Sequence, residues 1–270
     1  MPIGHCQRHN RKKMELLFNK YQGTGNDFIM IDNRGQSFRE GDLDLVRRLC
    51  DRKFGIGADG LILIKDKKGF DFEMIYFNAD GSQSMCGNGA RCAVAFSKSL
   101  GLLTDKCRFL AIDGPHEAIY INGQVELGMS PVQQIYAVDD DYFINTGSPH
   151  YVRFVEEVNS YPILEEGARI RYSDNYKPSG TNVNFVKRIS EDEIAVRTYE
   201  RGVENETLSC GTGVTACALA LGSQSGKNRI KIQTPGGQLT VRFVAKPNGT
   251  FHDIILSGPA KQVFKGSVEV

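Results

Sequence analysis

An internal repeat is the sequence feature that most constrains how this chain can fold. Three strings in the first half align with three in the second half at a displacement of 122 residues: 25–28 with 147–150, 59–63 with 181–185, and 76–78 with 198–200. Two additional residues then enter the second half, so that Cys86-Gly87-Asn88-Gly89 aligns with Cys210-Gly211-Thr212-Gly213 at a displacement of 124. Because the register holds across four separate strings, a duplicated structural unit is favoured over coincidence among glycine-rich loops.

Short runs of β-type residues alternate with few helical runs in both halves. Each aligned turn enters a hydrophobic run typical of a strand, at 28–31 and 151–155. Unbroken helical patterns follow the two Cys-Gly-x-Gly strings, at 90–100 and 214–221. We therefore predict an α+β fold of two pseudo-symmetric mixed β/α domains, each a sheet wrapped around a central helix. Matching residues of two such halves would approach one interdomain cleft from opposite sides, and we expect the active site there.

Charge and hydropathy exclude several classes of partner. The 33 basic and 32 acidic residues are scattered along the chain and leave a formal net charge of +1, without the basic stripe that a nucleic-acid backbone requires. No apolar run approaches the roughly 18 residues of a membrane span, and residues 1–13 lack the apolar core of a signal peptide. We expect a cytoplasmic protein that binds neither nucleic acid nor membrane. Residues 1–13 are predicted to form a flexible N-terminal extension, which makes Met14 a candidate for the natural start.

Seven cysteines spread over 270 residues favour reduced thiols over a disulfide framework. Cys86 and Cys210 differ from the others because a glycine pair and then a helical run follow each of them, which predicts a helix N-terminus at each thiol. The glycines let backbone N–H groups approach a ligand, and the partial positive charge of a helix end favours a carboxylate there. The same field is expected to lower the pKa of each thiol and to stabilise a thiolate.

Two thiols at matching places in facing halves suit a stereoinversion without a cofactor. One thiolate would remove the α-proton of an amino acid, and the other thiol would deliver a proton to the opposite face. The donors at the two helix ends would stabilise the negative charge that develops on the substrate carboxylate. The residues alone therefore predict an enzyme that inverts a small amino acid and needs no cofactor.

Simpler interpretations compete for the same residues. Cysteines are most often small buried apolar residues, which we expect for Cys50, Cys92, Cys107 and Cys217, the last two within helices. A zinc site is disfavoured because Cys-x-x-Cys spacing and a histidine cluster are missing, so no metal is predicted. The glycine strings match no complete Walker or dinucleotide-binding pattern, which disfavours binding of a nucleotide phosphate.

The string Met85-Cys86-Gly87-Asn88-Gly89-Ala90-Arg91-Cys92 and its counterpart Ser209-Cys210-Gly211-Thr212-Gly213 closely resemble those of diaminopimelate epimerase, which interconverts LL- and meso-2,6-diaminopimelate. The strings at 25–28, 77–81 and 199–202 share the resemblance, which spans essentially Met14 to the C-terminus. It implies the duplicated diaminopimelate-epimerase-like fold and a role in the biosynthesis of lysine and of peptidoglycan precursors. Family members are often homodimers, and we expect a homodimer here.

The C-terminal segment 258–270 resembles the segment that in this family returns to the first domain. The resemblance therefore implies a discontinuous first domain, at 14–131 plus 260–270, and a second domain at 132–259.

The resemblance also implies roles for individual residues. Cys86 and Cys210 are the acid/base pair and exchange roles with the direction of the reaction, while His150 and Glu200 lie beside the reacting centre as further catalytic residues. The reacting α-carboxylate is implied to bind to Gly87, Asn88, Gly211 and Thr212. An arginine can fork onto a carboxylate and a glutamate can bind an ammonium. Such contacts with the amino and carboxylate groups are implied for Asn26, Asn78, Ser148, Asn182, Glu200 and Arg201.

Two positions depart from the commonest pattern of the family. Gly60 stands where a glutamine is common, and Ser148 stands where an asparagine commonly precedes the Pro-His pair. Ser148 keeps a hydroxyl that can contact a substrate. Gly60 has no side chain to offer, so it is left out of the predicted site and recognition of the far end of the substrate stays open.

Other functions remain open at this point. Proline and hydroxyproline racemases share the fold but usually carry a histidine after the Cys-Gly pair, where this chain has Asn88. Isomerases of the phenazine-biosynthesis type share the fold but lack the paired cysteines. A thiol redox protein would instead join Cys86 and Cys210 in a reversible disulfide, and a structural binding module would leave both cysteines unexplained.

Overall fold

The computed structural model describes residues 15–270, so the expectation for residues 1–13 lies outside the described range. The first half of the chain contains β1 (Glu15–Gly23), β2 (Asn26–Asp32), α1 (Leu43–Cys50), β3 (Gly60–Lys65), β4 (Phe72–Asn78), α2 (Gly87–Ser99), β5 (Lys106–Ala111), β6 (Gly114–Ile121) and β7 (Gln124–Gly128). The second half contains β8 (Ile135–Val138), β9 (Asp141–Asn145), β10 (Pro149–Phe154), α3 (Ile163–Arg171), β11 (Asn182–Arg188), β12 (Glu193–Glu200), β13 (Asn205–Thr207), α4 (Gly211–Ser225), β14 (Arg229–Thr234), β15 (Gly237–Ala245) and β16 (Phe251–Pro259). A last strand, β17 (Lys261–Glu269), follows.

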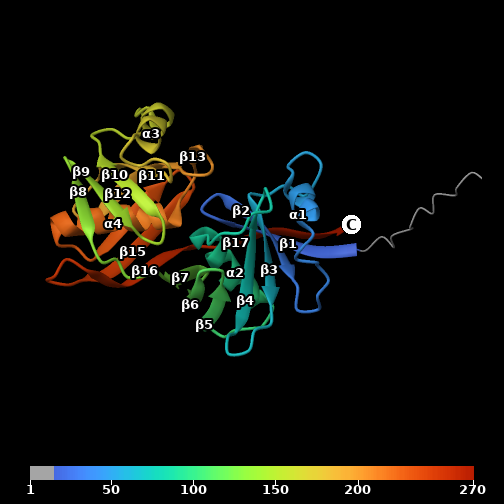
Figure 1. Cartoon of the computed structure of the whole chain (residues 1–270). Coiled ribbons are helices and arrows are strands. Elements are labelled where there is room, and N and C mark those ends of the chain that lie inside the picture. Colours follow the sequence, from blue (N-terminus) through green and yellow to red (C-terminus); the bar gives the residue numbers. More distant parts are fainter. Residues whose placement is uncertain (1–14) are drawn as a thin grey trace, which may run out of the picture.

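The repeat in the sequence is also a repeat in strand pairing. In the first half β2 runs parallel to β3 with Phe28 opposite Gly60, and in the second half β10 runs parallel to β11 with His150 opposite Asn182. The antiparallel pairs β3–β4 and β11–β12 keep the same displacement of 122 residues. The two halves lie side by side (Figure 1), and the predicted α+β fold of two pseudo-symmetric halves is confirmed.

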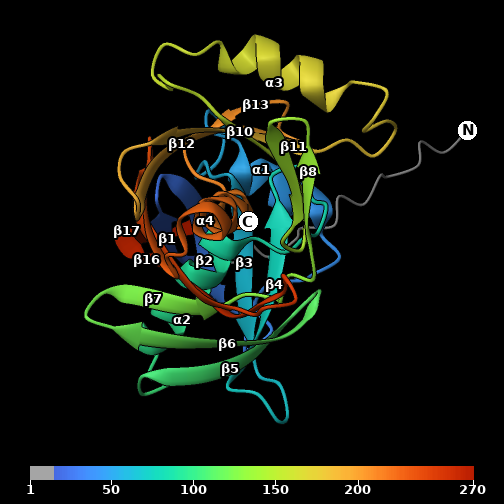
Figure 2. The same cartoon turned by 90° about the vertical axis from the view of Figure 1, so that its left-hand side faces the viewer.

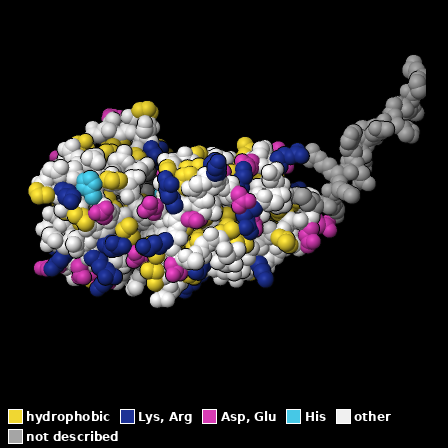
Figure 3. Space-filling view, turned by 90° about the horizontal axis from the view of Figure 1, so that it is seen from below, with side chains coloured by type: hydrophobic (Ala, Val, Ile, Leu, Met, Phe, Trp, Pro, Cys, Tyr) yellow, Lys and Arg dark blue, Asp and Glu magenta, His cyan; other side chains and the backbone are white. Residues whose placement is uncertain are grey.

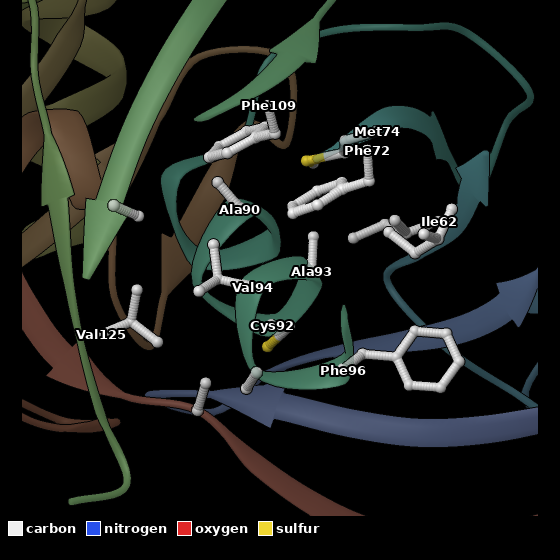
Figure 4. Packing of buried hydrophobic residues seen from close by; sticks show 14 of the residues in the cluster. Ile62, Phe72, Met74, Ala90, Cys92, Ala93, Val94, Phe96, Phe109 and Val125 are labelled. Atoms are coloured by element: carbon white, nitrogen blue, oxygen red, sulfur yellow. The ribbon is translucent and has the colours of Figure 1, made fainter. Parts of the chain in front are cut away.

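A helix fills the centre of each half, as predicted. α2 is buried from Asn88 to Ser97, and Figure 4 shows its small and apolar side chains facing Phe72 and Phe109 from the surrounding strands. α4 is buried from Gly213 to Gly222, and Figure 2 shows it nearly end-on among β10, β11, β12 and β16. A helix that a sheet encloses on most sides must be apolar around its whole circumference, which explains why neither sequence carries a single apolar stripe.

The outer helices α1 and α3 cover the opposite face of each sheet. Val46 and Leu49 of α1 pack in one cluster with Leu61 and Leu63 of β3, while Ile62 and Ile64 of the same strand belong to the cluster around α2. The sequence of a strand that is buried on both faces is a continuous apolar run rather than an alternation of apolar and polar residues. The run from Leu61 to Ile64 is therefore a consequence of the layered arrangement of helix, sheet and helix.

The two half-sheets join into one hydrogen-bonded sheet. β7 of the first half pairs antiparallel with β16 of the second half. The C-terminal strand β17 pairs antiparallel with β1, from Glu15 opposite Glu269 to Gln22 opposite Lys261. In the second half β8 pairs with β9, and it thereby takes the place that β17 takes beside β1 in the first half. The chain thus returns to the first half through β17, which Figure 1 shows in red.

Charge on the surface is mixed rather than segregated. Lys and Arg side chains are interspersed with Asp and Glu side chains on the face in Figure 3. Ion pairs such as Lys67–Glu73 and Arg242–Glu126 join neighbouring side chains. No helix within residues 15–270 is long and apolar enough to cross a membrane.

The four cysteines expected to be structural are all buried, which confirms that prediction for Cys50, Cys92, Cys107 and Cys217. Cys92 and Cys217 lie in the central helices. The prediction of a helix around Cys107 is wrong, because this residue lies in β5. Buried and more exposed residues alternate strictly along 106–111, which is the period of a strand.

The halves also touch where two turns meet. Gly236, between β14 and β15, packs so closely against the turn between β1 and β2 that a Cβ atom on it would lie 1.8 Å from the carbonyl oxygen of Thr24. The same Cβ atom would lie 3.1 Å from the carbonyl oxygen of Leu208, which accepts a hydrogen bond from the Gly236 N–H at 2.9 Å. The position of a Cβ atom is fixed by its own backbone and no side-chain rotation moves it, so this contact requires glycine.

Substitution Gly236→Ala is therefore expected to push the two turns apart and to lower the melting temperature by about 5 °C or more. The control is Gly41→Ala, because a Cβ atom on Gly41 meets nothing within 4 Å. Thermal unfolding followed by circular dichroism measures both variants. Equal melting temperatures for Gly236→Ala and the unsubstituted protein would contradict the close contact.

Candidate active site

Cys86 and Cys210 occupy the N-cap positions of α2 and α4, so both helices begin where the sequence predicts. Their backbone angles are similar, with φ −134° and ψ 115° at Cys86 and φ −115° and ψ 114° at Cys210. The N–H group of Gly89 donates a hydrogen bond to Cys86 Sγ at 3.4 Å. Both sulfurs therefore lie at a helix start, and of the two only Cys86 Sγ accepts a capping hydrogen bond.

The two helix N-termini meet at Gly87 and Gly211. A Cβ atom on Gly211 would lie 3.6 Å from Gly87 Cα and 3.2 Å from a methyl group of Leu256. Asn88 bridges the junction, since its Nδ2 donates to the carbonyl oxygen of Ser209 at 2.8 Å. The free N–H groups of two helices converge here, and such convergence suits an anionic group.

Two cavities share walls at this junction, and both contain Gly87, Glu200, Cys210 and Thr212. The Asn78 lobe, of about 420 Å³, adds Asn26, Tyr76, Asn78, Cys86, Asn88 and Gly211. The Arg201 lobe, of about 390 Å³, adds Ser148, Asn182 and Arg201. The structure thus gathers the predicted site residues around one junction, except for His150, which lines neither lobe.

Asn26 is oriented toward Cys86 by a network on the surface. Its Nδ2 donates to Asp59 Oδ2 at 2.6 Å, and because a carboxylate only accepts, this bond turns Asn26 Oδ1 toward the cleft. Asn26 Oδ1 then lies 3.5 Å from Cys86 Sγ and 3.4 Å from Asn88 Nδ2, both of which donate to it. Arg52 Nη2 donates a hydrogen bond to the other carboxylate oxygen of Asp59, Oδ1, at 2.7 Å.

A chain of hydrogen bonds lies behind Cys210. Its Sγ is 3.5 Å from Thr212 Oγ1, which is 2.9 Å from His150 Nε2. Asn184 Nδ2 donates to the carbonyl oxygen of Tyr151 at 2.9 Å and lies 3.3 Å from His150 Nδ1. Since an amide nitrogen only donates, His150 Nδ1 accepts and Nε2 carries the ring proton. Thr212 therefore accepts from His150, and its own hydroxyl proton is free for Cys210.

His150 is completely buried, and this burial, together with the charge of Arg201, lowers its pKa to about 3. The imidazole is therefore neutral near pH 7 and touches Thr212 rather than the space where a ligand would bind. Its geometry is that of a residue that positions another side chain.

Burial dominates the acidity of both thiols. It raises the pKa of Cys86 to about 11 and also raises the pKa of Cys210. The N–H groups of Gly89 and Gly213 lower these pKa values, but by less, and the charge of Glu200 raises both. The expectation that the helix ends give both thiols a lowered pKa is therefore wrong, because it neglected the desolvation of sulfur in a closed junction.

Glu200 and Arg201 carry opposite charges into the site from the end of β12. Burial raises the pKa of Glu200, and the Thr207 hydroxyl opposes this by donating to its Oε2 at 2.8 Å. The guanidinium of Arg201 donates to the carbonyl oxygen of Ser179 at 3.2 Å and to Ser148 Oγ at 3.5 Å. The acceptors of both bonds are neutral oxygens, so the charge of Arg201 is available to a ligand.

Sequence analysis missed several residues that shape the site, among them Asp59, Asn184, Thr207 and Tyr76. The repeat offered a signal for one of them, because Tyr76 aligns with Thr198, a far smaller residue. The omission of Gly60 fits its packing, since a Cβ atom there would lie 2.4 Å from the ring of Tyr76. Among residues 15–270 no group of three or more His, Cys, Asp and Glu side chains is placed to hold a metal ion.

A sequence profile described as Diaminopimelate epimerase matches residues 18–133 and 142–261 of this chain. The chain belongs to the diaminopimelate epimerase family. The diaminopimelate epimerase of Flavobacterium psychrophilum is 51% identical over 253 residues, which cover 92% of this chain and 98% of that protein. The relationship therefore extends over both halves and includes both cysteine strings.

Solved structures with the same fold include more distant proteins. A phenazine biosynthesis protein of the PhzF family from Bacillus anthracis superimposes with a TM-score of 0.74 at 12% identity, covering 95% of this chain and 100% of the other. A hydroxyproline epimerase from Agrobacterium vitis, with bound trans-4-hydroxy-L-proline, superimposes with a TM-score of 0.68 at 14% identity, covering 95% and 93%. These similarities concern the fold, whereas sequence identity places the chain in the diaminopimelate epimerase family.

The raised pKa of Cys86 predicts how its alkylation depends on pH. Because iodoacetamide reacts with the thiolate, the rate at Cys86 is expected to be low at pH 7 and to rise about tenfold per pH unit up to pH 9. Peptide mapping by mass spectrometry measures each site separately, and the buried Cys107 serves as the unreactive control. A rate at Cys86 that levels off below pH 8 would indicate an acidic thiol and contradict the raised pKa.

Proposed function

We propose that this chain is a cofactor-independent epimerase that interconverts LL- and meso-2,6-diaminopimelate through proton transfers at Cys86 and Cys210. The observation that carries the proposal is the position of these two cysteines, at the N-caps of two helices that meet from opposite halves at one junction. Membership of the diaminopimelate epimerase family supports the substrate. The product would serve the biosynthesis of lysine and peptidoglycan precursors.

In the proposed reaction one cysteine acts as base and the other as acid. The thiolate forms an S–H bond with the α-proton while the Cα–H bond breaks and its electron pair moves toward the carboxylate. The N–H groups around Gly87, Asn88, Gly211 and Thr212 stabilise the charge on that carboxylate. The second cysteine then gives its proton to the opposite face of Cα and is left as a thiolate. The carbon is inverted, and the two thiols have exchanged protonation states.

The hydrogen bonds around the two sulfurs differ, and on that basis we assign their roles at the start of the reaction, when the substrate is bound. Asn26 Oδ1 can only accept, so it favours the protonated form of Cys86. Thr212 accepts from His150 and can donate to Cys210, which favours a thiolate there. Cys210 is therefore the proposed base of the substrate complex and Cys86 its acid, while His150 acts by positioning Thr212.

The remaining polar residues suit a substrate with two amino-acid ends. Glu200 would bind the ammonium at the reacting carbon, and Arg201 would bind the carboxylate at the far end. Asn78, Asn182 and Ser148 lie on the walls beside these charges and would complete the hydrogen bonds.

We further propose that the enzyme is a cytoplasmic homodimer whose first domain comprises residues 14–131 and 260–270 and whose second comprises 132–259. The pairing of β17 with β1 supports the assignment of the C-terminal strand to the first domain. Leu17 and Val263 on these strands are 70% and 58% exposed, which supports a contact between subunits there. The molar mass of the protein in solution, from light scattering, tests the dimer.

Proton exchange tests the proposed function directly. Reduced protein incubated with LL-diaminopimelate in heavy water is expected to place deuterium at the α-carbon and to produce the meso isomer. Cys86→Ala and Cys210→Ala should each slow epimerisation by about 10²- to 10⁴-fold, because each variant lacks one proton carrier. Cys107→Ala, which removes a buried thiol outside the site, should not. Deuterium exchange into proline in place of diaminopimelate would contradict the proposed substrate. The absence of exchange into any amino acid would contradict the proposal that the protein is an enzyme.

The Thr212 hydroxyl gives a second test. Thr212→Val keeps the backbone N–H but removes the donor to Cys210, so kcat/KM is expected to fall about tenfold and its rise with pH to move to higher pH. Thr212→Ser, which keeps the hydroxyl, is the matched control and should retain most activity. A pH profile of Thr212→Val that matches the unsubstituted enzyme would count against the hydrogen bond to a Cys210 thiolate.

A further inference from the structure

Arg91 is a buried cation to which the proposed reaction gives no role. It lies in α2, five residues after Cys86, and is completely buried. Its Nη2 donates a hydrogen bond to the hydroxyl of Thr24 at 3.1 Å, whereas neither Nε nor Nη1 has a hydrogen-bond partner within residues 15–270. No carboxylate therefore bonds to this guanidinium. Burial of a charge without a counter-ion is costly, so this arrangement calls for a functional explanation.

The guanidinium lies beside the first turn of α2. A Cβ atom on Gly23 of β1 would lie 3.4 Å from Arg91 Nη2 and 3.2 Å from the carbonyl oxygen of Asn88, so both atoms border the same point. A helical side chain extends toward the N-terminus of its own helix, which explains this position. Asn88 is also a wall residue of the cavity that contains Cys86. The charge of Arg91 therefore lies directly behind the wall of the site.

A strand of the second half covers the other side of the guanidinium. A Cβ atom on Gly258 of β16 would lie 3.1 Å from Arg91 Nε and 3.3 Å from its Cζ. Gly258 follows Leu256 by two residues, so both face the same side of the strand, and both are buried. Leu256 is the residue whose methyl group reaches Gly87 and Gly211. Arg91 is thus the neighbour, on this face, of the junction at which the two helices meet.

The charges around Arg91 and Cys86 leave Arg91 as the cation without a carboxylate. Burial lowers the pKa of Arg91, and the charges of the Cys92 and Cys86 thiols oppose this. An arginine side chain keeps its proton in proteins, so the guanidinium stays charged. The other ionisable groups that line the Asn78 lobe with Cys86 are Arg52, Asp59, Tyr76, Glu200, Glu206 and Cys210. Of these, Arg52 is paired with Asp27 and Asp59.

We propose that Arg91 is an electrostatic positioning residue, whose unpaired charge adds to that of the helix start and stabilises the anions formed there, the Cys86 thiolate and the substrate α-carboxylate. It touches neither of them and acts from behind the first turn of α2, where the N–H groups attract the same anions. Its counter-ions are then the anions of the reaction rather than a carboxylate of the protein. For the α-carboxylate the inference rests on the proposed function, whereas the thiolate of Cys86 can be measured without a substrate.

Alkylation of Cys86 by iodoacetamide tests the effect on the thiol. In Arg91→Met, which replaces the cation with an apolar chain, the rate at pH 8 is expected to fall about three- to tenfold, because loss of a nearby positive charge raises the pKa of Cys86. Arg91→Gln, which is neutral but polar, should give the same slower rate and serves as the test if Arg91→Met does not fold. Arg91→Lys keeps the charge and should retain most of the rate. Thr24→Val is the matched control, because it removes the hydrogen bond to Nη2 and leaves the cation in place.

Epimerisation and thermal unfolding complete the test. For Arg91→Met, kcat/KM with LL-diaminopimelate is expected to fall about tenfold, while the melting temperature stays the same or rises because a buried unpaired charge is removed. An unchanged rate of alkylation at Cys86 in the neutral variants, with or without a lower melting temperature, would overturn the inference. An equal loss of rate in Thr24→Val or in Arg91→Lys would also overturn it, because both variants keep the charge. An unsubstituted protein that does not epimerise diaminopimelate would overturn the proposed function instead, and the alkylation rates would still decide the role of Arg91.

Discussion

The close approach of Gly87 and Gly211 is the constraint on which the rest of the molecule depends. Two helix N-termini can meet there only if each helix is held inside its own sheet and the sheets join without filling the junction. The pairing of β7 with β16 meets this requirement, because Leu256 of β16 lies opposite Leu127 and also reaches both glycines. The strand that joins the half-sheets is therefore also the floor of the junction. The apolar circumference of both helices follows from the same arrangement.

Duplication gives the two halves similar backbones, but the side chains that they bring to the cleft differ. The displacement of 122 residues places Phe28 where the second half has His150, and Asn78 where it has Glu200. The first half thus contributes aromatic packing and amides, and the second contributes the histidine chain and the charges of Glu200 and Arg201. Divergence after duplication has kept the helix starts and changed the side chains around them, which gives each thiol a different set of hydrogen-bond partners.

The features that sequence analysis predicted are those with local or periodic causes. The repeat, the α+β class, the two central helices and the N-cap positions of Cys86 and Cys210 all follow from strings that can be read within one segment. The burial of the thiols could not be predicted in this way, because it arises from the meeting of segments 124 residues apart. The same holds for Tyr76, whose position depends on the absence of a side chain at Gly60 on the neighbouring strand. The wrong prediction of a helix at Cys107 has a different origin, because the alternation of polar and apolar residues that is typical of a strand is present in the sequence at 106–109.

The raised pKa of the thiols is consistent with their proposed task. The α-proton of an amino acid is a far weaker acid than a thiol, so a thiolate with high proton affinity is the better base, although little of it forms near pH 7. Arg91, fully buried in α2, lowers the pKa of Cys86, whereas the charge of Glu200 raises the pKa of both thiols. In the proposed complex the substrate ammonium binds Glu200 and offsets its charge, so binding itself lowers the thiol pKa values. A strong base is then generated where the α-proton is, and the unoccupied enzyme keeps its thiols protonated and unreactive.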